Sequence, residues 1–167
     1  GLGDVYKRQG HDLTYLAENG LVTGLDLPAT LYADMGGSLM ASEAVLQARL
    51  TQLQKGKGVL QEIALSDAAG YLALPRRWGL TTPGAAVGGG HAGYRVYPCR
   101  DGRVALAALE PHFAAALGAA AGLRQSGLFA MFAPENHAAI AAFLAGKTRA
   151  ELDALAQAKD IPLHTLA

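Results

Sequence analysis

Three side chains that can carry protons stand beside turn or helix-start signals in this sequence: His11, Asp34 and Glu110. Imidazole and carboxylate groups are the usual general acids and bases of enzymes, and a carboxylate can also act as a nucleophile. Asp34 ends a short apolar run and precedes Gly36 and Gly37, which would leave room for a ligand beside it. Asp34 is therefore the first candidate for a chemical role.

Each of these residues also has an ordinary structural interpretation. An aspartate at a helix start accepts hydrogen bonds from the first free N–H groups and complements the helix dipole, which would account for Asp34. Glu110 precedes Pro111, a typical first residue of a helix. His11 would lie just outside a short helix that Asp12 begins and that Asn19-Gly20 ends. From the residues alone, both interpretations stand.

The elements that would position Asp34 follow from local patterns. Residues 30–33 are expected to be extended, and apolar spacing predicts a long amphipathic helix over 37–54, with Gly56 as a left-handed cap. A strand over 59–65 and a helix over 68–74, closed by Pro75, are expected next.

The second half of the chain reads as a hairpin followed by helices. Strands over 94–98 and 103–109 flank Asp101-Gly102, a strong hairpin signal, and a helix runs from Pro111 through Leu117. Further helices are predicted over 134–144 and after the capping box of Thr148 and Glu151, with a short extended tail at 161–163. Gly88-Gly89-Gly90 is predicted to be a mobile loop that could move over a site.

Composition narrows the class of protein. The chain has 167 residues, 51% of them hydrophobic, and a formal net charge of +0, with no basic block, which argues against nucleic-acid binding and a polybasic membrane anchor. No apolar run approaches the roughly 18 residues of a membrane span. The single cysteine excludes an internal disulfide and a cysteine-cluster metal site, and it fits a cytoplasmic location. No metal-ligand spacing is seen, so no metal is expected.

Residues 1–9 resemble the translation of a sequencing adaptor and are interpreted as non-native. On that hypothesis the chain is a fragment of a longer protein, and the fold is carried from residue 10 onward.

Three separated segments together resemble one family. The segments are Gly10-His11-Asp12-Leu13-Thr14-Tyr15-Leu16, Ala33-Asp34-Met35-Gly36-Gly37-Ser38, and residues 94–113 with Asp101-Gly102 and Glu110-Pro111. The order and spacing of the three segments support the resemblance more strongly than any single motif does. Over residues 10–167, the chain resembles the family III CoA-transferases of the CaiB/BaiF type. That family includes carnitine–CoA transferases, formyl-CoA transferase and α-methylacyl-CoA racemase.

The resemblance implies an α/β fold, namely the C-terminal part of the family fold. Residues 10–75 would be the end of a Rossmann-like large domain with the catalytic aspartate and its long helix, and residues 76–167 a linker and small α/β domain. Family members are about twice this length and form interlocked homodimers, so a homodimer is expected of the full-length protein.

The resemblance also implies residue roles. Asp34 matches the catalytic aspartate, His11 the second acid/base group of the racemase, and Glu110 a glutamate that supports that histidine. Asp12 and Tyr15 match residues next to CoA, and the helix start at Gly36–Gly37 is expected to offer an N–H group to the thioester oxygen. Residues 88–90 match the flexible glycine loop of the transferases, although His91 and Arg95 depart from the usual residues there.

The expected activity is racemisation of a 2-methylacyl-CoA, with His11 and Asp34 as the two bases. Two alternatives stay open: a CoA-transferase that forms an acyl-aspartyl intermediate on Asp34, and an inactive fragment with only a packing role. The coenzyme A thioester would be the substrate, and no tightly bound cofactor is expected.

Overall fold

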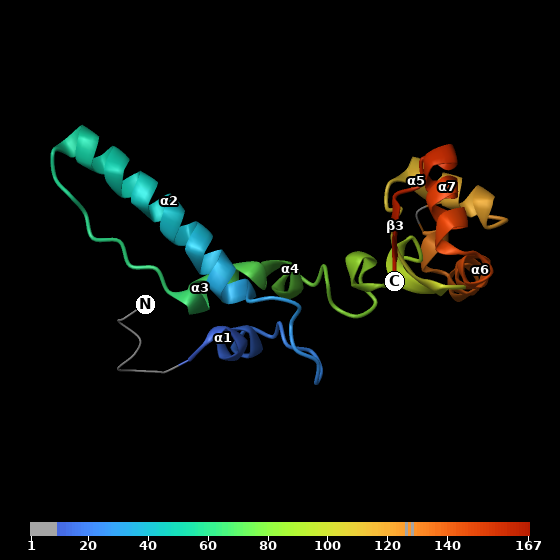
Figure 1. The fold of residues 1–167 in the computed structure, drawn as a ribbon, viewed down its shortest axis with the longest axis horizontal. Helices are drawn as coiled ribbons and strands as arrows, with labels where there is room; N and C mark the ends of the chain where they lie inside the picture. Colours follow the sequence, from blue (N-terminus) through green and yellow to red (C-terminus); the bar gives the residue numbers. More distant parts are fainter. Residues whose placement is uncertain (1–9, 126, 128) are drawn as a thin grey trace. The chain divides into compact units, whose positions relative to one another are not determined.

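The computed structural model describes residues 10–125, 127 and 129–167. They belong to two compact units, one ending at Trp78 and the other spanning Gly79–Ala167. The first unit is helical, and the second combines helices with an antiparallel sheet (Figure 1).

The first unit contains α1 (Asp12–Glu18), α2 (Tyr32–Lys55), α3 (Leu65–Leu72) and α4 (Leu74–Arg77). Its small core gathers at the start of α2, where α1 and α3 both pack against that helix. The fully buried side chains of this core are Leu16, Ala33 and Ala69. The chemistry-bearing residues near Asp34 therefore lie on the best-packed part of this unit.

Helix α2 begins earlier than the apolar spacing predicts. The expected extended segment over 30–33 is wrong at its end, because the helix already begins at Tyr32 and Asp34 lies in its first turn. The early start is stabilised by an acceptor from elsewhere in the chain, since Asp12 caps the first amides. At the other end, Gly56 has φ +72°, and the predicted left-handed cap is confirmed.

The strand predicted over 59–65 is wrong. Residues 59–64 form neither helix nor strand, and α3 begins at Leu65. A strand needs a partner edge for its N–H and C=O groups, and the sheet of the described residues lies in the other unit. Pro75 does not close a helix either: α3 ends at Leu72, and Pro75 lies in the first turn of α4, where its missing N–H costs little.

The second unit is built on a three-stranded antiparallel sheet in the order β1-β2-β3. Strands β1 (Tyr94–Cys99) and β2 (Gly102–Ala107) form the predicted hairpin, with Gly102 paired to Cys99 as the first residue of β2. Strand β3 (Leu163–Leu166) pairs with β2. The sequence predicts only an extended tail up to residue 163, because a strand of 4 residues gives little alternation to detect.

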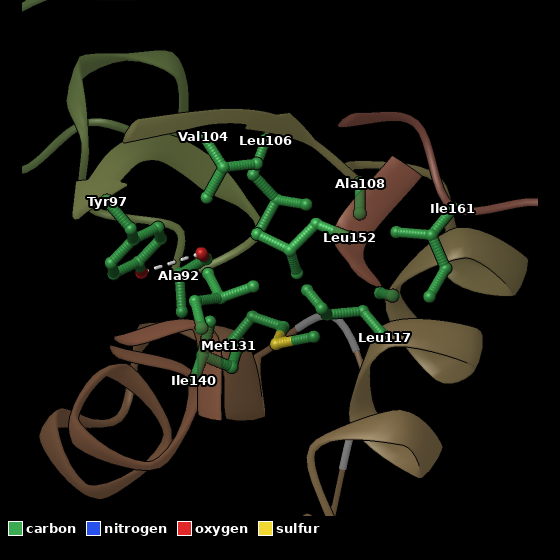
Figure 2. Close-up of a cluster of buried hydrophobic side chains, with 12 residues drawn as sticks. Ala92, Tyr97, Val104, Leu106, Ala108, Leu117, Met131, Ile140, Leu152 and Ile161 are labelled. Carbon is green, nitrogen blue, oxygen red and sulfur yellow. Dashed lines mark hydrogen bonds between the residues drawn. The ribbon is translucent and has the colours of Figure 1, made fainter. Parts of the chain in front are cut away.

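The helices of this unit pack on the side of β2 that carries Val104 and Leu106, and the resulting core is shown in Figure 2. They are α5 (Pro111–Ala120), α6 (Pro134–Ala145) and α7 (Arg149–Lys159), with short 3-10 turns η2 (Ala86–Gly88) and η3 (Ala130–Phe132). Two predicted helix starts are confirmed. Pro111 opens α5, and Thr148 caps α7 by accepting from the Glu151 N–H at 3.3 Å.

Among the described residues, no helix combines the length and the apolar character that crossing a membrane requires.

Candidate active site

A buried aspartate joins the two helices that carry His11 and Asp34. Asp12 is only 5% exposed, and its Oδ1 accepts hydrogen bonds from the backbone N–H groups of Ala33 at 2.6 Å and Asp34 at 3.0 Å. Those amides belong to the first turn of α2, whose N–H groups have no partner within the helix. The side chain of the residue after His11 thus caps the helix of Asp34, across more than twenty residues of sequence.

His11 is the N-cap residue of α1. The Thr14 hydroxyl accepts from the His11 backbone N–H at 3.0 Å and donates to the His11 carbonyl at 2.7 Å. These bonds fix the backbone of His11, which is an exposed residue. The arrangement leaves an imidazole on a rigid helix start, as an acid/base group requires.

Asp34 is half-buried in the first turn of α2. The partial positive charge of the helix N-terminus favours a carboxylate there. Because the Asp12 carboxylate is bonded to backbone amides, the Asp34 side chain is not needed to cap its own helix. The cap interpretation therefore does not account for the Asp34 carboxyl group, and its catalytic role stays a prediction.

Of the two glycines after Asp34, Gly37 leaves no room for a ligand, whereas Gly36 lines a hollow of about 350 Å³ together with Ala68 and Leu72 of α3. Gly37 is buried, and a Cβ placed there would lie 2.3 Å from Leu65 Cδ2; one at Gly36 would lie 3.4 Å from the Cβ of Ala68. Both glycines thus face α3. The expectation that the helix starts at Gly36 and offers an N–H group there is wrong, because α2 begins at Tyr32 and its free amides at Ala33 and Asp34 are taken by Asp12.

Tyr15 is half-buried on α1 and packs against the core of the first unit. Its hydroxyl donates to the Gly10 carbonyl at 3.2 Å. The described contacts of Tyr15 and Asp12 are thus both internal, and their expected role next to CoA stays a prediction.

Glu110 belongs to the second unit, as the N-cap residue of α5. It is exposed, and its side chain does not cap the helix. The cap interpretation therefore does not explain this carboxylate. The structure brings His11, Asp12, Tyr15 and Asp34 together in one unit, and it places Glu110 with residues 88–90 in the other.

Residues 88–90, called the glycine segment below, form a tight turn that ends η2. Gly89 has φ +88°, which glycine adopts without strain. A Cβ at Gly88 would lie 1.9 Å from the Thr82 carbonyl oxygen, and one at Gly90 would lie 2.0 Å from that of Gly84. Each glycine thus has a local structural reason, and the predicted mobility of the segment stays a prediction.

Two side chains that the sequence does not mark as functional contact the glycine segment. His137 Nε2 lies 2.8 Å from the Gly90 carbonyl oxygen, and Arg95 Nη1 donates to the Gly89 carbonyl at 3.3 Å. Arg95 Nη1 is also 3.5 Å from His137 Nδ1. No local pattern links a histidine on α6 with this segment, so sequence reasoning could not find the pair.

His91, directly after the glycine segment, is fully buried. Its Nδ1 accepts from the Gly93 N–H at 3.0 Å, so the neutral ring carries its proton on Nε2, which is buried and has no hydrogen-bond partner among the described residues. The Phe132 ring stands at 88° to the imidazole, with 5.5 Å between centroids. Burial, and secondarily the nearby His137, lower the pKa of His91 below its usual value of 6.5.

A cavity of about 720 Å³ lies in the second unit beside the glycine segment, and sequence reasoning missed it. Its lining combines backbone of the segment with side chains of all three strands, including Gly89, Arg95, Tyr94, Ala105 and His164. Among the described residues, no three His, Cys, Asp or Glu side chains gather as a metal site.

Comparison with known proteins finds one matching family model and several similar solved structures. The model of a family described as "CoA-transferase family III" matches residues 1–167. The solved structure of the hypothetical protein Rv3272 from Mycobacterium tuberculosis is similar at 22% identity and a TM-score of 0.75, over 96% of this chain and 48% of that chain. A CAIB/BAIF family protein from Brucella suis is similar at 18% identity and a TM-score of 0.69, over 96% and 48%.

The likeness to these structures confirms the predicted α/β fold, and the family match confirms the predicted family resemblance. The chain spans about half the length of the solved structures that it matches, 48% in both cases.

Proposed function

The chain belongs to CoA-transferase family III, and from this premise we propose that it supplies the acid/base pair of an acyl-CoA racemase. His11 and Asp34 would be the two catalytic groups, and a 2-methylacyl-CoA the substrate. The observation that carries the proposal is the Asp12 bridge, which ties the residue next to His11 to the amide of Asp34 at 3.0 Å.

The chemistry needs two groups that exchange protons at one carbon. One base removes the proton from C2 of the thioester to leave an enolate, and the conjugate acid of the other returns a proton to the opposite face. In the reverse direction the two groups exchange roles, so no net proton is consumed. Because Asp12 occupies the free amides of α2, the enolate oxygen must take its hydrogen bonds from outside that helix start.

A transferase is the second candidate, and the position of Asp34 favours it. A helix N-terminus stabilises a carboxylate, which is the form that attacks a thioester. Attack on the carbonyl carbon would form an acyl-aspartyl anhydride as the carbon–sulfur bond breaks and CoA leaves as the thiolate. The thiolate would then attack the Asp34 carbonyl of that anhydride, releasing the donor carboxylate and leaving a CoA thioester on Asp34. An acceptor carboxylate would displace CoA from this thioester to form a second anhydride, and CoA would attack the acceptor's carbonyl carbon, giving the new thioester and free Asp34.

Incubation with 2-methylacyl-CoA in heavy water, with and without an added carboxylic acid, distinguishes the candidates. The assay uses the gene product that carries this sequence, and mass spectrometry follows deuterium at C2 and CoA on the added acid. Deuterium uptake without an acceptor supports the racemase. CoA transfer without deuterium uptake would favour the transferase over the racemase. The absence of both signals would favour a protein with only a packing role.

Variants of the two residues sharpen this test. His11→Ala is expected to abolish deuterium uptake, whereas a transferase would keep CoA transfer in the same variant. Asp34→Asn is expected to abolish either activity. Glu43→Gln, exposed on α2, serves as the control. The homodimer expected for the full-length protein is tested separately by light scattering on the same gene product.

A further inference from the structure

We infer that His137 and Arg95 are positioning residues that hold the glycine segment in its folded conformation. The two side chains bond to successive carbonyl groups of that segment, at Gly90 and Gly89. His137 belongs to helix α6 and Arg95 to strand β1, so the glycine segment is bonded to two elements of the second unit. The inference rests on the proposed function in one respect only, namely that the glycine segment would lie beside the acyl-CoA substrate.

The hydrogen bonds fix one form of His137. A carbonyl oxygen can only accept, so Nε2 carries the proton in its 2.8 Å bond to Gly90. In the neutral ring, Nδ1 is then the acceptor for Arg95 Nη1 at 3.5 Å. Arg95 in turn donates to the Gly89 carbonyl at 3.3 Å. All three bonds are satisfied at once, and each side chain orients the other.

The backbone conformation explains why such ties are needed. The amides of Gly88 and Gly90 both donate to the Ala85 carbonyl, at 2.9 Å each. These local bonds are the turn's own support, and glycine loses more conformational freedom on ordering than any other residue. Side chains that bond to the segment's carbonyls offset that entropic cost. Without them, the folded turn should open more often.

The tied segment also borders the cavity of the second unit. Gly89 and Arg95 both line it, so opening of the turn would change the wall of that cavity. His91, which follows the segment, is fully buried and anchors its other end.

Amide hydrogen exchange on the full chain tests the inference without any activity assay. His137→Ala is expected to raise exchange at Gly88 and Gly90 about fivefold or more, the effect of losing one hydrogen bond. His137→Gln, whose amide can still donate to the Gly90 carbonyl, is expected to restore slow exchange. His112→Ala, an exposed histidine on α5, is the matched control and should leave the segment unchanged.

Unchanged exchange at Gly88 and Gly90 in His137→Ala would overturn the inference. Amides of the β1–β2 hairpin report whether the unit stays folded. If His137→Ala unfolds it, Arg95→Ala decides the question alone: faster exchange in the segment supports the tie, and unchanged exchange refutes it.

Kinetics of the gene product then separate this inference from the proposed function. A segment that both loosens in His137→Ala and borders the substrate should raise KM for acyl-CoA while kcat stays within about twofold, because binding rather than proton transfer is affected. Faster amide exchange with unchanged kinetics would support the role of His137 and Arg95 in holding the glycine segment. It would contradict only the assumption that this segment lies beside the substrate.

Discussion

The carboxylate of Asp12 accepts a hydrogen bond from the backbone amide of Asp34 at 3.0 Å. The same oxygen accepts from Ala33 at 2.6 Å, so one buried side chain holds the start of α2 against the start of α1. His11, adjacent to Asp12, is carried by that contact to the same part of the first unit. The contact turns two separate sequence motifs into one local structure.

Removal of this cap should destabilise the first unit. Asp12→Ala would leave two amides without their acceptor, at a cost of about 1–3 kcal/mol, and Asp12→Asn should cost less because an oxygen acceptor remains. Amide exchange at Ala33 and Asp34, followed by NMR, measures the effect. Asp26→Asn, on an exposed loop residue, is the control. Equal protection of both amides in Asp12→Ala and wild type would contradict the capping role.

Asp34 should be chemically important and structurally dispensable. Asp34→Asn is expected to lower deuterium uptake by at least about 10²–10⁴-fold, the usual contribution of a general acid or base, and to abolish CoA transfer, in which Asp34 would be the nucleophile. The Asp12 bond uses the backbone of Asp34, so protection of that amide should be unchanged. Loss of activity together with loss of protection would indicate a folding defect instead.

Gly88 should not accept a side chain. Gly88→Ala would place a Cβ 1.9 Å from the backbone oxygen of Thr82, and backbone cannot move aside as a flexible side chain can. We expect a loss of about 1–3 kcal/mol, typical of overpacking, measured by urea denaturation. Gly127→Ala is the matched control, because no atom of the described residues lies within 4 Å of a Cβ there. Equal stabilities of the two variants would contradict the packing account.

The second unit should lose stability in mild acid because of His91. Its folded-state pKa is lowered by burial, so below about pH 6.5 the unfolded chain binds a proton that the folded chain resists. Stability should therefore be constant above that pH and fall as the pH decreases from 6.5 through the lowered pKa. Hydrogen bonds from the backbone of Arg149 and Thr148 lower the pKa values of Asp101 and Glu151, respectively. These two carboxylates therefore contribute stability that is lost only in stronger acid, below about pH 4.5.

Thermal denaturation between pH 5 and pH 8 measures this effect of about one titrating group. In His91→Asn the amide oxygen can accept from the Gly93 N–H in place of Nδ1, and the loss between pH 6.5 and pH 5 should become smaller. His112→Gln, on an exposed residue of α5, is the control. A wild-type melting temperature that does not change across this range would contradict the prediction.

The sequence predicts those features of the fold that depend on neighbours in the chain. Gly56, Pro111 and the Thr148–Glu151 box each mark a helix end through its own residues, and all are confirmed. The hairpin is also confirmed, but its turn is not the expected one: Gly102 pairs with Cys99 as the first residue of β2, so Arg100 and Asp101 connect the strands.

Features that depend on distant partners could not be predicted. The start of α2 is shifted by a carboxylate from α1, and residues 59–64 have strand-like composition but pair with no strand of the described residues. At the candidate site, the sequence marks His11 and Asp34 but not the bond through Asp12 that relates them. Likewise, nothing near residue 137 indicates that its imidazole reaches the glycine segment.

The order of the strands has a consequence for how the second unit folds. Strands β1 and β2 are consecutive, so their hairpin can form within microseconds. Strand β3 follows α5, α6 and α7 in the chain, and its His164 pairs with Ala105 of β2, roughly sixty residues earlier. We therefore expect the hairpin and helices to assemble first and the β2 edge to stay unpaired until last. That exposed edge is the point at which the nascent unit is most open to pairing with another chain.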